Sequence, residues 1–239
     1  MNELRNLLEY GVDLLKKRSI RNWLDCGTLL GVIREQSLLS WEKDIDLGAL
    51  KDQVSHLDII FIINQAREDG YDVNVYDTSI SISKNGYVLD IKLYEKREDI
   101  FFEDKKIPKN LLSSMLCYLV HCFSSNYPTS RDGKNILRNF VIKIIHFSSK
   151  IIPRQLRKVI VYPIKYLCDN YLTIDISEAV PCKYFQTFEE IMFLGKLYTI
   201  PEKKEDYLVF RYGENWRVPN KNWVTERDDG GFLYLQNKK

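Results

Sequence analysis

Two aspartates separated by one apolar residue form the most chemically informative feature of the sequence. The run Asp44-Ile45-Asp46-Leu47 alternates acidic and apolar residues. In a β-strand this alternation places both carboxylates on one face and both apolar side chains on the other. Two residues of strand span about 6.5 Å, so the two carboxylates can bind one cation from the same side. Carboxylate oxygens suit Mg²⁺ or Mn²⁺ better than Zn²⁺, and we interpret the pair as a divalent-cation site.

An isolated acidic pair is more often part of a solvated strand face, so the interpretation as a cation site depends on the sequence before the pair. Residues 23–26 are typical of a short strand, which leads into Gly27 and Thr28 and then into a helical pattern that ends near Glu35. Glycine permits a tight turn, threonine is a good helix N-cap, and the free amides at a helix N-terminus favour an anion. An anion-binding turn close to paired carboxylates favours metal-assisted phosphoryl transfer. The alternative is an ordinary turn with packing glycines.

The motifs in residues 20–95 resemble the LicD family, which includes the fukutin-related transferases. The shared order is Gly-Thr-Leu-Leu-Gly at 27–31, then Arg34, then Trp41, and then Asp-Ile-Asp-Leu at 44–47. A second stretch, with the order F-x-G, IP, YL, YG, W and P across 180–223, is similar to the C-terminal signature of the family. The run before the aspartates is usually acidic in this family, whereas this chain has Glu42-Lys43 and leaves Lys43 without a role.

The resemblance implies a nucleotidyltransferase fold and the transfer of a phospho-group from a CDP-activated donor to a glycan. It also places a third carboxylate on a later strand, in a setting that Val-Leu-Asp-Ile-Lys at 88–92 matches. We therefore expect Asp44, Asp46 and Asp90 to be the catalytic residues and the ligands of a Mg²⁺ or Mn²⁺ ion. Without the resemblance, Asp90 would be interpreted as a surface residue.

Six further residues are expected to contact the donor. They are Gly27, Thr28, Arg34, Lys92, Tyr212 and Trp216. The glycine-threonine turn would supply backbone donors, and the arginine is a candidate clamp for a phosphate oxygen. The two C-terminal aromatic residues would stack on a base or sugar, or alternatively form an aromatic lid over the core.

The chain is expected to form an α+β fold, with a nucleotidyltransferase-like mixed sheet flanked by helices and a helical insert in the middle. Its 239 residues suffice for one sizeable core or for one catalytic domain with an insert. We expect a catalytic core at 1–107, a basic helical insert at 108–178, and a C-terminal part at 179–239 that completes the catalytic domain. Asp228 to Gly231 are predicted to lie in a flexible tail.

The middle segment is strongly basic. Residues 131–168 contain nine lysines and arginines against a single acid, Asp132, in a pattern typical of two amphipathic helices broken at Pro153. The basic residues either form a solvated face or contact an anionic membrane or a polyanionic glycan. A nucleic-acid partner is not expected, because no nucleic-acid-binding motif accompanies the charge.

We expect a cytoplasmic protein, with the inner face of the membrane as a place of contact. The N-terminus lacks the apolar region of a signal peptide, and no apolar run approaches the roughly 18 residues that span a bilayer. Five scattered cysteines, an odd number, favour reduced thiols.

The function expected from the resemblance is transfer of a phospho-alditol or phosphocholine-type group from a CDP-activated donor to a hydroxyl of a cell-surface glycan, with release of CMP. The acceptor would be a capsule-type polysaccharide, a lipopolysaccharide or a teichoic-type polymer. One alternative is transfer of a nucleoside monophosphate to a small molecule or protein. Another is a non-catalytic, membrane-peripheral scaffold.

Overall fold

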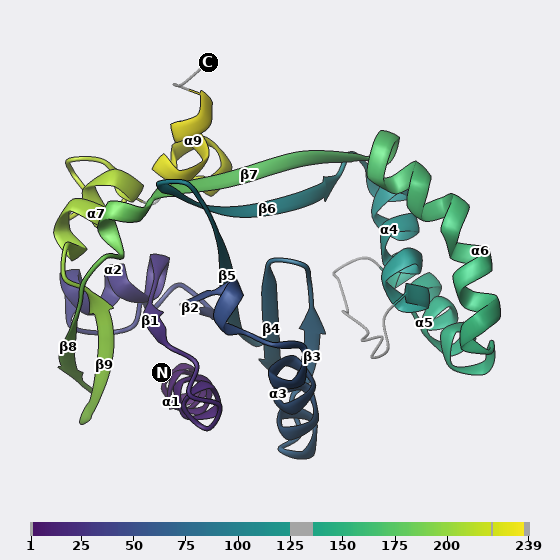
Figure 1. Cartoon of the computed structure of the whole chain (residues 1–239), viewed down its shortest axis with the longest axis horizontal. Helices are drawn as coiled ribbons and strands as arrows, with labels where there is room; N and C mark the ends of the chain where they lie inside the picture. The colour runs from purple at the N-terminus through teal and green to yellow at the C-terminus, as the bar shows by residue number, and fades with distance from the viewer. Residues whose placement is uncertain (1, 125–135, 221, 237–239) are drawn as a thin grey trace. The chain divides into compact units, whose positions relative to one another are not determined.

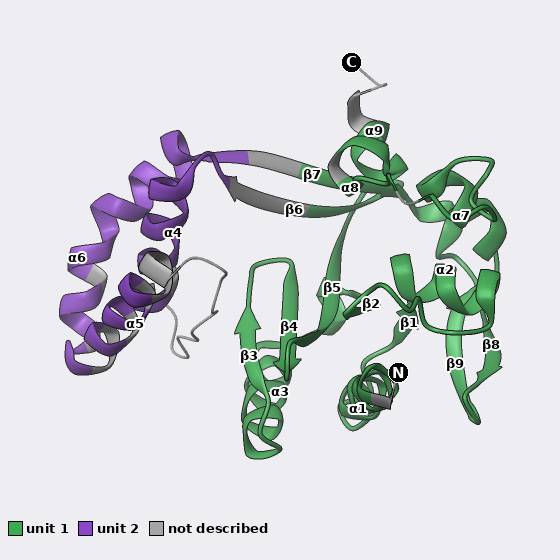
Figure 2. Ribbon diagram, turned by 180° about the vertical axis from the view of Figure 1, so that it is seen from behind, with its two compact units in different colours: residues 1–104, 177–239 green, residues 105–176 purple. Residues whose placement is uncertain are grey.

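The computed structural model describes residues 2–124, 136–220 and 222–236, and the chain forms two compact units (Figure 2). Unit 1 comprises residues 1–104 and 177–239, and unit 2 comprises residues 105–176. The boundaries expected from the sequence are 108 and 178.

A mixed sheet with flanking helices forms the centre of unit 1, which confirms the predicted fold class (Figure 1). Its strands lie in the order β1 (Asn22–Leu24), β2 (Asp44–Leu50), β5 (Tyr87–Arg97), β4 (Ser79–Lys84) and β3 (Asp72–Val75). The β2–β5 pair is parallel, and the other neighbours along this path are antiparallel. β5 also pairs with β6 (Ile100–Pro108), which in turn pairs with β7 (Thr173–Pro181).

Helix α1 (Asn2–Lys16) covers one face of β2 and β5. Its apolar residues recur at helical spacing, and five of them are buried, namely Leu4, Leu7, Leu8, Leu14 and Leu15. At Gly11 the helix approaches the strands so closely that an added Cβ would collide with Leu89. The helical spacing of the leucines between Asn2 and Lys17 predicts a helix that packs beneath the sheet, and the structure confirms this packing.

The other elements of unit 1 connect or flank these strands. They are α2 (Cys26–Glu35), the 3₁₀ turns at Lys51–Gln53 and Cys182–Tyr184, α3 (His56–Glu68), the hairpin β8 (Phe188–Phe193) and β9 (Lys196–Pro201), α7 (Lys204–Tyr212), α8 (Thr225–Asp228) and α9 (Gly230–Gln236). Helix α3 begins at a capping box, in which the Ser55 hydroxyl accepts from the Asp58 amide and the Asp58 carboxylate accepts from the Ser55 amide. The hairpin turn contains Gly195 at φ 81°, a backbone conformation that glycine adopts readily.

The described residues of unit 2 form three helices, α4 (Leu111–Ser124), α5 (Ile136–Ile151) and α6 (Arg154–Leu167), followed by a π-helical turn at Cys168–Leu172. Helix α4 packs against both of the others, around the buried residues Cys122, Phe123 and Val161. The predicted pair of helices on either side of Pro153 is confirmed. The run Asn-Tyr-Pro-Thr-Ser at 126–130 predicts a break between helices, and this run lies outside the described residues. No helix in the described ranges is both long enough and apolar enough to cross a membrane.

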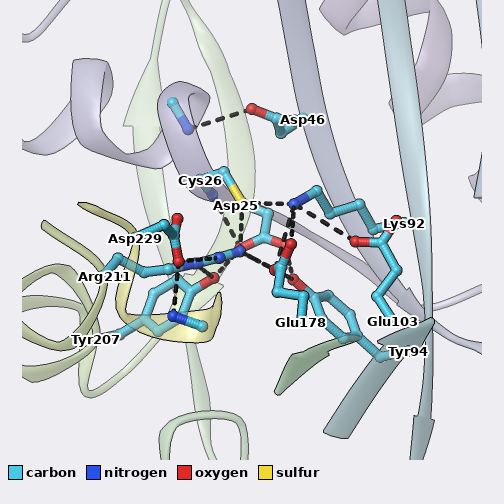
Figure 3. Close-up of polar contacts among 12 residues, drawn as sticks. Asp25, Cys26, Asp46, Lys92, Tyr94, Glu103, Glu178, Tyr207, Arg211 and Asp229 are labelled. Carbon is cyan, nitrogen blue, oxygen red and sulfur yellow. Dashed lines mark hydrogen bonds and ion pairs between the residues drawn. The ribbon is translucent and has the colours of Figure 1, made fainter. Parts of the chain in front are cut away.

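A buried arginine attaches the C-terminal residues to the rest of unit 1 (Figure 3). The Arg211 side chain on α7 is fully buried, and its guanidinium is paired with Glu178 on β7 and, at 2.8 Å, with Asp229. The Asp229 carboxylate also accepts from the Gly231 amide at 2.7 Å. The prediction of a flexible tail at 228–231 is therefore wrong. Asp229 is buried, and its ion pair with Arg211 attaches this segment to unit 1.

Substitution of this arginine is expected to destabilise the protein strongly. Arg211→Met would leave Glu178 and Asp229 as buried carboxylates without their shared guanidinium, which costs about 3–5 kcal/mol in unfolding free energy. The matched control is Arg217→Met, because Arg217 pairs with Glu205 and both side chains are more than half exposed. The control is expected to lose less than about 1 kcal/mol. Equal losses for the two variants in urea unfolding would contradict this account of Arg211.

Candidate active site

The parallel pairing of β2 and β5 brings the three predicted aspartates to one face of the sheet. Asp46 and Asp90 are directly paired across these strands. Neighbouring strands lie about 4.8 Å apart, and paired residues project to the same side. Asp44 precedes Asp46 by two residues and shares this face. Leu47 and Leu89, which contact α1, point to the opposite face.

The three carboxylates repel one another at this position. Asp44 is exposed, whereas Asp46 and Asp90 are half-buried. Burial is the main cause that raises the pKa of Asp46 well above its usual range; Lys92 opposes this increase, and the charges of Asp44 and Asp90 add to it. Burial, followed by the charge of Asp90, also raises the pKa of Asp44. The fold therefore concentrates negative charge that a cation or protons would relieve.

Glu42 is a fourth carboxylate at this position, and it was not among the predicted site residues. Its Oε2 atom lies 2.5 Å from the place where a Cβ on Gly27 would be, so the carboxylate lies directly over this glycine. Burial, followed by the charge of Asp44, raises the pKa of Glu42 to about 7, and Arg34 opposes the increase. One feature of the sequence could have identified Glu42 as a site residue. It lies two residues before Asp44, in the run that is usually acidic in the LicD family.

The N-terminus of α2 is directed at the Asp46 carboxylate. The Gly27 amide donates to Asp46 Oδ2 at 3.2 Å, and the Cys26 amide donates to Asp25 Oδ1 at 2.9 Å. Asp25 is thus the N-cap, and the prediction of Thr28 as N-cap is wrong. Thr28 lies in the first turn instead, where its Oγ1 accepts from the Asp46 amide at 2.8 Å. The turn therefore holds Asp46, and the helix dipole favours the negative charge there.

Lys92 lies on the same face of β5 as Asp90, but its ammonium group is buried among protein groups (Figure 3). Its Nζ lies 3.1 Å from Cys26 Sγ, 3.3 Å from Glu178 Oε2 and 3.6 Å from Glu103 Oε2. The sequence predicted a contact between Lys92 and the donor. The structure instead places this ammonium group in the interior, close enough to Asp46 to lower that residue's pKa.

The buried polar network around Lys92 was not predicted. Tyr94 donates to Asp25 Oδ2 at 2.7 Å, and Tyr207 donates to the other oxygen of the same carboxylate. Arg211 Nη2 donates to Cys26 Sγ at 2.7 Å and to Tyr94 Oη at 3.3 Å. The network therefore holds Asp25 and Cys26 of the β1–α2 turn in place through residues that share no sequence motif.

The remaining predicted residues have different surroundings. Arg34, near the end of α2, donates to Glu35 Oε1 at 2.7 Å and to the Trp216 carbonyl at 3.1 Å. The Trp216 side chain is buried, as an aromatic lid over the core would be. Tyr212 is half-buried and packs on Trp223, with ring centroids 5.0 Å apart. Burial, and then the charge of Cys26, raise the pKa of the Tyr212 phenol well above its usual range.

The sheet face that carries Asp44, Asp46 and Asp90, called the carboxylate face below, offers ligands of the type that a hard divalent cation prefers. Asp44, Asp46 and Asp90 offer carboxylate oxygens, which Mg²⁺ and Mn²⁺ prefer. The Ser81 hydroxyl donates to Asp90 Oδ1 and so orients that carboxylate. Among the described residues, no three His, Cys, Asp or Glu side chains are already arranged around one point. The side chains of these three carboxylates would therefore have to rotate for all three to bind one ion.

Known proteins resemble the part of the chain that contains this face. Residues 19–111 match the family model LicD/FKTN/FKRP, nucleotidyltransferase domain. Uncharacterized protein RP689 of Rickettsia prowazekii (strain Madrid E) is 33% identical over 98 residues, which cover 41% of this chain and 35% of that protein. Ribitol 5-phosphate transferase FKRP of Homo sapiens is 34% identical over 56 residues, which cover 23% of this chain and 11% of that protein. The match thus spans only a minor part of each relative's length.

Among solved structures, the solution structure of the antibiotic-resistance factor ANT(2'')-Ia is similar at 11% identity and a TM-score of 0.34, and the match covers 72% of this chain and 100% of that chain. The family match is independent of this likeness and includes Gly27, Glu42 and all three aspartates. Residues 19–111 of this chain therefore resemble the nucleotidyltransferase domain of the LicD/FKTN/FKRP family, in agreement with the resemblance seen in the sequence motifs.

Proposed function

We propose that this chain transfers a phospho-alditol or phosphocholine-type group from a CDP-activated donor to a glycan hydroxyl and releases CMP. The observation that supports this proposal best is the pairing of Asp46 with Asp90, beside Asp44, within the segment that matches the family. The relative FKRP is named a ribitol 5-phosphate transferase, which supports a phospho-alditol as the transferred group.

In this proposal Asp44, Asp46 and Asp90 hold Mg²⁺ or Mn²⁺. When bound, such an ion neutralises charge on the phosphate oxygens. Phosphoryl transfer depends mainly on positioning and charge, so the groups that hold the carboxylates matter as much as the carboxylates themselves. The Gly27 amide and Thr28 hydroxyl position Asp46, and the Ser81 hydroxyl positions Asp90.

The proposed reaction joins the acceptor oxygen to the distal phosphorus of the donor. The bond between that phosphorus and the bridging oxygen breaks, and CMP leaves with the electron pair. The proton of the attacking hydroxyl needs an acceptor, and we propose Asp90 for this role. Glu42 is the second candidate, because it lies over Gly27 and a pKa of about 7 suits a general base at neutral pH.

The carboxylate at 46 is expected to be essential for turnover but not for folding. Asp46→Asn keeps an oxygen that accepts from the Gly27 amide and removes the charge. CMP release in the presence of Mg²⁺ should fall at least about 100-fold, which corresponds to ~3 kcal/mol of transition-state stabilisation. Asp72→Asn, at an exposed position of β3, is the matched control and should retain wild-type turnover. Wild-type turnover by Asp46→Asn would refute the assignment.

The nucleotide that stabilises the protein distinguishes the proposed reaction from nucleotidyl transfer. CDP or CMP with Mg²⁺ should raise the melting temperature, because a hundredfold excess over Kd adds about 2.7 kcal/mol to the unfolding free energy. A panel of CDP-linked donors, scored for CMP formation with and without candidate glycans, then identifies the transferred group. A preference for ATP over the cytidine nucleotides would instead favour transfer of a nucleoside monophosphate.

In the metal-free protein, the contribution of Glu42 to stability should fall as the pH rises. The pKa of Glu42 is raised from 4.5 to about 7 in the folded state, so the folded state binds this proton more tightly than the unfolded chain does. Its contribution is therefore complete below pH 4.5 and is lost as the pH passes 7. In the presence of a chelator, Glu42→Gln should be more stable than wild type at about pH 8, since it removes a buried charge.

The control for this experiment is Glu190→Gln, at an exposed position of β8, which should follow the wild-type curve. Urea unfolding between pH 5 and pH 8 is the measurement, and a Glu42→Gln variant less stable than wild type at the higher pH would contradict the charge repulsion described above.

A further inference from the structure

Helix α5 in unit 2 has apolar side chains on two sides, one packed in the core and one exposed. Ile145, on the helix, and Ile152, just beyond its end, pack against the buried core of the unit. A second row remains exposed on the other side, formed by Phe140, Ile144, Phe147 and Ile151. The spacing of four, three and four residues aligns this row along the helix. A helix needs only one apolar face to join a core, so the exposed row has no role in packing the unit.

Helix α6 repeats this arrangement. Val161 is buried in the core of the unit, whereas a second set of large apolar side chains on the same helix is exposed. This set comprises Leu156, Val159, Ile160 and Leu167, each at least 46% exposed. The exposed side chains of Tyr162 and Tyr166 extend it. Single exposed apolar residues are ordinary, but two rows of this length on consecutive helices mark an interaction surface.

The charge of the unit indicates what this surface contacts. Residues 105–176 contain twelve lysines and arginines against three aspartates, a net charge of +9, whereas the whole chain carries +2. Lys109, Lys143 and Lys165 are exposed in the structure. Exposed apolar rows on basic helices are typical of helices that lie in the interface of an anionic bilayer.

We propose that unit 2 docks on an anionic lipid bilayer through the exposed rows of α5 and α6. The helices lie in the interface, because their 16 and 14 residues are too few to cross the hydrocarbon core. Phe147 and its neighbours insert between the headgroups, and the lysines contact lipid phosphates. This proposal depends only on unit 2 and is independent of the reaction proposed for unit 1.

Other partners fit the same surface less well. A second copy of unit 2 would bring a charge of +9 against +9, which opposes self-association. A polyanionic glycan would neutralise the basic residues but would leave the apolar rows in water. An anionic bilayer satisfies both the charge and the apolar surface.

Sedimentation of the full chain with lipid vesicles tests the proposal. We expect the protein to bind phosphatidylcholine vesicles that contain phosphatidylglycerol. This binding should weaken as salt is added and should be much weaker with vesicles of phosphatidylcholine alone. Phe147→Gln and Lys143→Glu should each lower the partition coefficient about tenfold. The matched controls are Leu57→Gln and Lys17→Glu, at exposed positions of unit 1, and both should bind as wild type does.

Circular dichroism and urea unfolding should be unchanged in all four variants, because the substituted side chains are exposed. Three results would overturn the proposal. The first is an absence of binding to anionic vesicles at low salt. The second is undiminished binding by Phe147→Gln, which would leave only a charge contact. The third is a wild-type protein that dimerises in solution but does not bind vesicles, with a dimer that Phe147→Gln abolishes.

Discussion

The parallel register of β2 and β5 is the constraint on which the carboxylate face depends. It pairs Asp46 with Asp90, and the same register buries Leu47 and Ile91 on the face that α1 covers. A slip of one residue in either strand would turn its acidic residues toward α1 and its apolar residues toward the carboxylate face. The free energy gained by burying the apolar side chains therefore also holds the carboxylates together.

Several neighbouring groups compensate for the repulsion that this register creates. The Gly27 amide and the N-terminus of α2 face Asp46, and the buried ammonium group of Lys92 lies close enough to lower its pKa. Lys92 is held in turn by Glu178, which is paired with Arg211 near the end of the chain. Residues of the C-terminal part thus help to set the electrostatics of a site whose carboxylates all come from the first hundred residues.

Local patterns in the sequence predicted the strands and the shared face, because alternation along a strand determines which side chains lie together. Asp90 needed the family resemblance in addition, since nothing local pairs it with Asp46. The network of Glu178, Arg211 and Asp229 could not be predicted, because these residues are far apart in the sequence and meet only through tertiary packing. Thr28 was misassigned because Asp25 caps the helix one turn earlier.

The proposed cation site at Asp44, Asp46 and Asp90 is tested most directly by titrating the metal-free full chain with Mn²⁺ and measuring bound Mn²⁺ by electron paramagnetic resonance. We expect one specific Mn²⁺ site per chain in the wild type and its loss in Asp90→Asn, because Asp90 is proposed to belong to the same cation site as Asp44 and Asp46. An Asp90→Asn variant that binds Mn²⁺ with wild-type affinity and stoichiometry would contradict a cation site shared by these strands.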